Sequence, residues 1–170
     1  HYVELAHNTL IRIAEGPGEL GARKELALAT LTRMQFGENG YFFAYDQHGQ
    51  LLMDPKLLAL QGVDFCDPND PASADSAQRI LATARRGGGV VRYSWSKPSS
   101  QAVVPKLAYV MTVPGWNWVI GTGIYLDDVQ GALQAIETGA RTNIEATRQR
   151  LYAIAAVCVV LIGLGGLALN

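Results

Sequence analysis

One lysine in the middle of an apolar segment is the residue with the clearest chemical meaning in this sequence. Lys106 stands in VVPKLAYV, and Tyr109 follows it three positions later. A buried ammonium group is costly unless it is paired, so such a lysine either extends to solvent or meets an anion. A small carboxylate would match its charge, and tyrosine hydroxyls would complete the hydrogen bonds of that carboxylate. These residues favour binding without turnover, because no activated nucleophile accompanies them.

Aromatic residues at alternate positions could form the walls of such a site. Successive side chains of a strand point to opposite faces, so Tyr41, Phe43 and Tyr45 share one face of a predicted strand. Tyr93 and Trp95 share one face of another. An aromatic strand of this kind is either plain core or the wall of a pocket.

Two glycines mark a third segment that could belong to the site. Gly121 and Gly123 share one face of a strand pattern that ends at Tyr125. Their missing side chains predict a strip where another group approaches the backbone. The residues leave two interpretations open, a pocket lined by rings or a helix packed on the glycines, and Lys106 favours the pocket.

Other motifs carry little catalytic, metal or cofactor chemistry. Ser94 and Lys97 match the S-x-x-K pattern of serine acylases, but a strand would separate them by roughly 10 Å, too far for proton transfer. The histidines are dispersed, and the aspartates at 64–70 lack the glycine and glutamate of a calcium-binding loop. We expect no enzyme activity, no metal and no cofactor. A membrane-anchored acylase and a purely structural interaction module are the alternatives.

Composition separates a globular part from a membrane segment. The net charge is -1, with 14 basic and 15 acidic residues and no basic stripe, which argues against nucleic-acid binding. Residues 151–170 include no charged side chain, and twenty helical residues span about 30 Å, so they predict a transmembrane helix. The first helical pattern begins at His1 without a capping residue. We therefore suspect that another membrane helix precedes it.

Hydrophobic periodicity predicts an α+β domain between these ends. Helical spacing runs over 1–15 and 19–34, over a segment capped by Ser73 or Asp75, and from Asp127 onward into the membrane segment. A period of two predicts five extended segments, at about 40–46, 50–53, 89–96, 103–113 and 116–125.

Four blocks of sequence together resemble a known family. GENGYFFAYDQHGQLLMDP, GGGVVRYSWSKP, VPKLAYV and GWNWVIGTGIYLDDV, in this order, are similar to the single Cache domain of bacterial methyl-accepting chemotaxis proteins. The resemblance implies a long N-terminal helix packed on a PAS-like, five-stranded antiparallel sheet. It also implies that residues 1–150 are a periplasmic sensor domain on the bacterial inner membrane and that 151–170 cross that membrane.

The resemblance further implies a ligand and the residues that bind it. Similar domains sense organic acids of two or three carbons, and the matching site positions in this chain are Phe43, Tyr93, Trp95, Lys106 and Tyr109.

One position departs from the family pattern and adds a sixth site residue. Asp54 precedes Pro55 where the family commonly has His-Pro. An aspartate in the pocket would repel a carboxylate, so it could instead pair with Lys106 or Arg92, accept a hydroxyl, or recognise an amine-bearing ligand. Arg92 alternates with Tyr93, which favours the surface for its side chain.

The resemblance and the long helices also suggest partners. We expect a homodimer that signals through its C-terminal helix to cytoplasmic partners by way of a region beyond this sequence. The alternative output modules are a histidine kinase and a nucleotide cyclase.

Overall fold

The computed structural model describes residues 2–36, 40–97, 99–136, 138, 144–145 and 147–151. The chain divides into two units, His1–Asp127 and Asp128–Asn170. Among the described helices, none combines the length and the apolar composition needed to cross a bilayer. The predicted membrane helix at 151–170 lies outside the described residues apart from Leu151, so it stays a prediction.

Five antiparallel strands form one sheet, as the alternation of residues predicts. They are β1 (Phe43–Tyr45), β2 (Leu51–Met53), β3 (Gly89–Ser96), β4 (Val103–Val113) and β5 (Trp118–Tyr125). Their order in the sheet is β2-β1-β5-β4-β3, and every neighbouring pair is antiparallel. The predicted five-stranded sheet is confirmed. β1 and β2 are shorter than predicted, with three residues each, and their register shifts between Ala44 and Tyr45.

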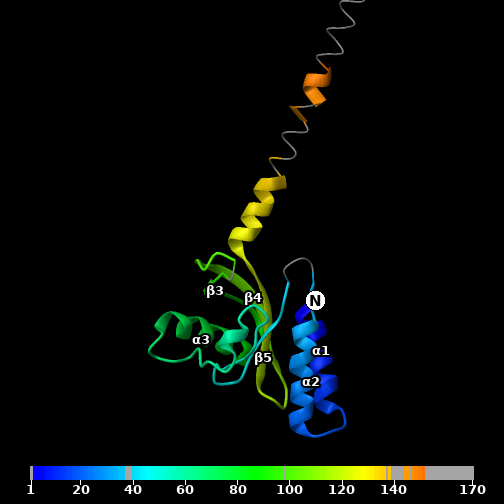
Figure 1. Cartoon of the computed structure of the whole chain (residues 1–170), viewed down its shortest axis with the longest axis vertical. Coiled ribbons are helices and arrows are strands. Elements are labelled where there is room, and N and C mark those ends of the chain that lie inside the picture. Colours follow the sequence, from blue (N-terminus) through cyan, green and yellow to red (C-terminus); the bar gives the residue numbers. More distant parts are fainter. Residues whose placement is uncertain are drawn as a thin grey trace, which may run out of the picture. The chain divides into compact units, whose positions relative to one another are not determined.

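Two helices cover one face of this sheet. Figure 1 shows α1 (Tyr2–Glu15) and α2 (Leu20–Arg33) side by side on the face opposite α3 (Pro71–Arg85). Each of the two carries a buried apolar stripe at helical spacing, with Val3, Ala6 and Leu10 on α1 and Ala27 and Leu31 on α2. Both helices lie within a residue or two of their predicted ranges. The resemblance implies a long N-terminal helix on the sheet, and α1 occupies this place with 14 residues.

The start of α3 differs from the prediction. The helix begins at Pro71, and the carboxylate of Asp70 accepts a hydrogen bond from the backbone N–H of Ser73 at 3.3 Å. Asp70 is therefore the N-cap, and the prediction of Ser73 or Asp75 is wrong. Proline suits the first helical position because its missing N–H would have no partner inside the helix.

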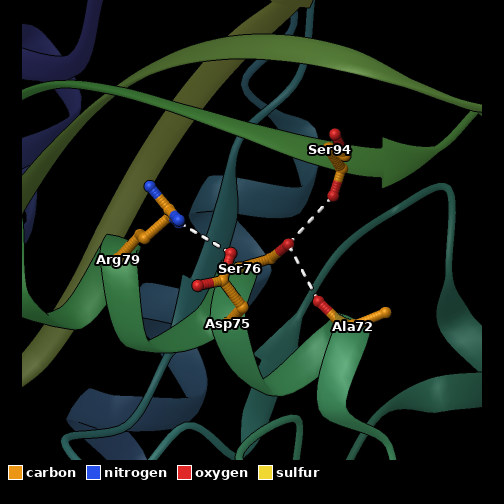
Figure 2. Close-up of polar contacts among 5 residues, drawn as sticks. All are labelled: Ala72, Asp75, Ser76, Arg79 and Ser94. Atoms are coloured by element: carbon orange, nitrogen blue, oxygen red, sulfur yellow. Dashed lines mark hydrogen bonds and ion pairs between the residues drawn. The ribbon is translucent and has the colours of Figure 1, made fainter.

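A buried serine fixes α3 to the neighbouring strand. Ser76 is 2% exposed, and its hydroxyl lies 2.9 Å from the carbonyl oxygen of Ser94 on β3 and 3.2 Å from that of Ala72 (Figure 2). The next residue towards the N-terminus, Asp75, forms an exposed ion pair with Arg79 at 2.6 Å. The helix thus has one buried polar contact with the sheet and one ion pair in solvent.

The sheet separates two hydrophobic cores. The α1/α2-side core contains Val3, Ala6, Leu10, Ala27, Leu31, Phe42, Ala44, Met53, Val113, Trp118 and Ile120. The α3-side core contains Phe43, Tyr45, Leu51, Phe65, Ala77, Ile80, Leu81, Ala84, Val91, Tyr93, Trp95, Ala108, Val110, Val119 and Tyr125. Tyrosines therefore gather on the α3 side.

A further helix follows the sheet directly. Residues 126–136 are helical, close to the predicted start at Asp127. Asp127 belongs to the first unit of the chain, and its carboxylate accepts a hydrogen bond from the ammonium of Lys97 at 2.8 Å.

Candidate functional site

Lys106 is buried on the α3 side of the sheet. The residue is 1% exposed, and its direct cross-strand neighbours are Tyr93 on β3 and Tyr125 on β5. Paired residues of adjacent strands point to the same face, so the two rings flank the lysine. The side chain does not extend to solvent, which removes one of the two interpretations that the sequence leaves open.

Aromatic groups surround the ammonium of Lys106. Its Nζ donates a hydrogen bond to the hydroxyl of Tyr41 at 3.0 Å and lies 5.0, 5.4 and 4.9 Å from the ring centroids of Tyr41, Phe43 and Tyr125. We call Lys106 with these three rings the lysine cage. Among the described residues, no carboxylate forms an ion pair with Lys106. The rings attract the cation, but each such contact is worth only about 0.5–2 kcal/mol.

Burial and one nearby carboxylate set the charge of Lys106. Burial lowers the pKa of the Lys106 ammonium from 10.5 to about 8, and the negative charge of Asp54 opposes that shift. With this pKa, roughly nine-tenths of the ammonium groups are protonated at pH 7. The site therefore presents a buried positive charge under neutral conditions.

Asp54 brings a buried carboxylate to the same region. It is 4% exposed, and its Oδ1 accepts the backbone N–H of Lys56 at 2.8 Å, as in an Asx turn. Burial raises the pKa of the Asp54 carboxyl, while the bond from Lys56 and the charge of Lys106 oppose the shift.

Arg92 is exposed, because it alternates with the buried residues of β3, so its predicted place at the surface is confirmed.

The phenols near Asp54 stay protonated. Burial, followed by the charge of Asp54, raises the pKa of Tyr41 far above its ordinary value. Burial also raises the pKa of Tyr45 and Tyr93, with Asp54 a further cause for both. All three hydroxyls can therefore donate hydrogen bonds at neutral and alkaline pH.

The structure brings four of the six predicted site residues to the α3 side of the sheet, and a fifth, Asp54, is buried and acts on Lys106 through its charge. Phe43 belongs to the lysine cage, Tyr93 is paired with Lys106, and Trp95 lies 5.9 Å from Tyr93 between ring centroids. Asp54 acts on this group through its charge. Tyr109 lies on the opposite face and is 39% exposed, so the geometry leaves it outside the cluster.

Sequence reasoning selected neither Tyr41 nor Tyr125 for the site. Both contact the ammonium of Lys106. The alternation that groups Tyr41 with Phe43 was the signal that could have identified the first. For Tyr125, the signal was its place on the same face as the two strand glycines.

Neighbouring strands fill the strip beside the glycines. A Cβ at Gly121 would lie 2.6 Å from the ring of Phe43 and 2.8 Å from Val110, and one at Gly123 would lie 2.7 Å from the carbonyl oxygen of Leu107. Neither a ligand pocket nor a packed helix occupies this strip. Phe43 instead reaches its place in the lysine cage because residue 121 has no side chain.

The residues of the acylase alternative are arranged differently from a catalytic pair. Ser94 lies on β3, exposed and on alternate positions to Tyr93. Lys97 forms an ion pair with Asp127 at 2.8 Å. Within the described part of the chain, no group of histidine, cysteine, aspartate or glutamate side chains could hold a metal ion.

Comparison with known families decides what kind of domain carries this site. The family described as Single Cache domain 2 matches residues 8–139. The chain belongs to this family. The Cache domain itself is non-catalytic, and its α+β fold of N-terminal helices and a five-stranded antiparallel sheet is shared with solved sensor domains of chemotaxis proteins.

Two relatives show which proteins contain similar Cache domains. The sensor histidine kinase MctS of Rhizobium johnstonii is 39% identical over 126 residues, which cover 74% of this chain and 27% of the kinase. The methyl-accepting chemotaxis protein CtpM of Pseudomonas aeruginosa is 32% identical over 171 residues, which cover 99% of this chain and 30% of the receptor. The chain thus spans under a third of either relative.

Two solved structures share the fold of this Cache domain. A periplasmic sensor domain of a chemotaxis protein is 32% identical, with a TM-score of 0.61 over 72% of this chain and 89% of that one. A Cache chemosensory domain, solved as a basis for carboxylic acid recognition, is 28% identical, with a TM-score of 0.64 over 74% of this chain and 88% of that one.

Proposed function

We propose that this Cache domain is the periplasmic sensor of a membrane-bound bacterial receptor, and that it binds a short carboxylate on Lys106. The observation that carries the proposal is a buried ammonium held by three rings and one hydroxyl, with no ion-paired carboxylate among the described residues. Burying an unpaired charge costs several kcal/mol, which core packing alone gives no reason to retain. A carboxylate ligand would pair that charge.

The segment between β2 and α3 has to let the ligand enter. Leu57 packs on the α3-side core, Phe65 is part of it, and the ammonium of Lys56 lies 6.0 Å from the ring centroid of Tyr41. The same segment includes Leu58, which is 64% exposed. Residues 62–65 of this segment are hydrogen-bonded to residues 49–51. We expect residues 54–61, and not the central strands, to move when the ligand binds, because loops without sheet pairing open at the lowest free energy.

A chain of contacts leads from Lys106 to the C-terminal helix and supports signalling through that helix. Tyr125 ends β5, its ring belongs to the lysine cage, and its hydroxyl donates to the carbonyl oxygen of Ser96 at 3.1 Å. Lys97, which follows the last residue of β3, has its ammonium 5.7 Å from the centroid of the same ring and pairs with Asp127. A ligand that shifts Lys106 would therefore also shift the first turn of the helix at 126–136.

A second copy of this chain is the expected partner. The cleft between α1 and α2 has a volume of about 600 Å³. Its apolar lining includes Leu5 and Leu26, which are 61% and 56% exposed. Contiguous exposed apolar residues are typical of interaction sites. We expect sedimentation velocity to show a concentration-dependent dimer that Leu26→Glu dissociates, and a wild-type protein that is monomeric throughout would contradict this.

A chemoreceptor is the output that we propose, and a sensor histidine kinase is the second candidate. CtpM supports the first, because its similarity covers 99% of this chain. MctS supports the second, with 39% identity. The coding sequence downstream of Asn170 would distinguish them, since we expect it to encode either a methyl-accepting signalling region or a kinase.

Calorimetry on the isolated domain tests the ligand proposal. We expect acetate, propionate or pyruvate to bind to the wild-type protein and Lys106→Met to lose at least about tenfold in affinity, because a charge-assisted bond disappears. Lys24→Met is the matched control, since Lys24 also lies over a ring, 5.6 Å from Trp118, but on the α1/α2 side. Equal affinity of Lys106→Met and wild type would overturn the proposal.

A further inference from the structure

Two opposite charges are buried in the same site without an ion pair between them. Lys106 is 1% exposed and Asp54 is 4% exposed, and they are the only charged residues buried to this extent in the described part of the chain. Each shifts the pKa of the other through its charge. No ion pair joins them among the contacts of the described residues. The ammonium of Lys106 and the carboxylate of Asp54 therefore each need a partner of their own.

Both groups keep unused hydrogen-bonding capacity. An ammonium has three N–H donors, and within the described residues only the hydroxyl of Tyr41 accepts one from Lys106. Oδ1 of Asp54 accepts the N–H of Lys56, and the backbone N–H of Leu57 also lowers the pKa of this carboxyl by hydrogen bonding. A carboxylate can accept about four hydrogen bonds, so the remaining capacity of both groups indicates what a ligand should bring.

The charge of Asp54 acts on the lysine cage and its immediate surroundings. It raises the pKa of Tyr41, which bonds directly to Lys106, and of Tyr93, which is paired with Lys106 across the sheet. Contacts link the two groups as well: Lys56, whose N–H bonds to Asp54, has its ammonium 6.0 Å from the ring centroid of Tyr41, and Tyr41 bonds to Lys106. We therefore expect one small ligand to reach both charged groups.

We propose that Asp54 selects, at the Lys106 site proposed above, short carboxylates that carry a hydroxyl or ammonium donor on the carbon next to the carboxylate. The carboxylate of such a ligand pairs with Lys106, and its donor bonds to Asp54. A simple acid of the same length satisfies Lys106 but leaves Asp54 unpaired beside a second negative charge, which is unfavourable.

The turn at Asp54 does not by itself explain a buried carboxylate. Asp64 forms the same turn, with Oδ1 accepting the N–H of Cys66 at 2.8 Å, and Asp64 is exposed. The same hydrogen bond can thus be made at the surface, without the desolvation of a charge. Asp64 also supplies a matched control for substitution.

Three acids with the same carbon skeleton test the inference by calorimetry. Propionate, lactate and alanine differ in whether hydrogen, hydroxyl or ammonium occupies the carbon next to the carboxylate. We expect lactate or alanine to bind the wild-type domain about tenfold or more tightly than propionate, since an unpaired buried charge is penalised by at least that factor. Preference for lactate identifies a hydroxyl as the donor, and preference for alanine an ammonium.

Asp54→Asn isolates the role of the charge. Its amide oxygen can still accept the N–H of Lys56, so the turn is kept, and circular dichroism checks that the variant folds. We expect the preference over propionate to fall below about threefold and propionate itself to bind more tightly, because the repulsion is gone. Asp64→Asn should keep the wild-type preference.

Two results separate the inference from the function on which it rests. Equal affinities of the three acids for the wild type, or an unchanged preference in Asp54→Asn, would overturn the role of Asp54 and leave the Lys106 site in place. Binding that Lys106→Met does not weaken would overturn the proposed function as well.

Discussion

The two faces of the sheet are built from different kinds of residue. The α1/α2-side core consists of aliphatic and aromatic side chains, together with one methionine. Among the described residues, the buried polar side chains are Asp54, Ser76 and Lys106. Ser76 and Lys106 lie on the α3 side, and Asp54 acts through its charge on Lys106. Both faces bury apolar side chains, but the α3 side also holds a buried charge, which we propose that a ligand uses. This difference can be measured face by face.

The largest expected effect on stability comes from a substitution in the α1/α2-side core. Leu10 on α1 is 0% exposed, so Leu10→Ala leaves a cavity and should lower the free energy of unfolding by about 2–5 kcal/mol. Urea denaturation measures it. Leu58→Ala, at a position 64% exposed, is the control and should change the stability by less than about 0.5 kcal/mol. A loss of under 1 kcal/mol in Leu10→Ala would mean that this core contributes less to stability than its burial predicts.

A substitution on the α3 side is expected to change the free energy of unfolding by a smaller amount and to raise it. A pKa of about 8 in the folded protein against 10.5 for an ordinary lysine means that burying the Lys106 ammonium costs about 3 kcal/mol at pH 7. Lys106→Met removes that cost and loses the hydrogen bond to Tyr41, worth about 1 kcal/mol. It also loses the attraction of the three rings, so the substitution should raise the free energy of unfolding by at most about 2 kcal/mol.

The pH dependence of the stability of Lys106→Met tests whether the buried ammonium is the cause of the gain. Between pH 8 and 10.5 the unfolded chain holds the Lys106 proton and the folded protein loses it, so wild-type stability rises with pH. The advantage of Lys106→Met should shrink to less than half by pH 9.5. Urea denaturation at pH 7.0 and 9.5 measures both values, with Lys24→Met as the control. An advantage that stays constant with pH, or a loss of stability, would contradict the assignment.

The smallest effect concerns the hydroxyl that joins α3 to β3. Ser76→Ala removes the buried contact with the carbonyl oxygen of Ser94 and should cost about 1 kcal/mol in thermal or urea unfolding. Asp75→Asn breaks the neighbouring ion pair with Arg79, which is exposed, and should leave the stability unchanged within error. Equal effects of the two substitutions would show that burial on this face does not matter.

The sequence predicts much of this fold because periodicity is a local property. Alternation places Phe43 and Tyr93 on buried faces and Arg92 on the surface, as the structure shows. The same rule argues against Tyr109, since residues three apart in a strand point to opposite faces, and the family resemblance outweighed it. Contacts between distant segments are not local, so the bond between Tyr41 and Lys106, 65 residues apart, could not be read from the pattern.

Gly121 on β5 determines where the Phe43 ring of the lysine cage lies, because it has no side chain. Gly121 is the cross-strand partner of Phe43, and the ring rests in the space that a methyl group at 121 would claim. A methyl group at 121 would displace the far end of the Phe43 ring, and shifting a ring costs less energy than shifting a strand. The size of residue 121 therefore sets where Phe43 lies in the lysine cage, although residue 121 itself contributes no ring to that cage.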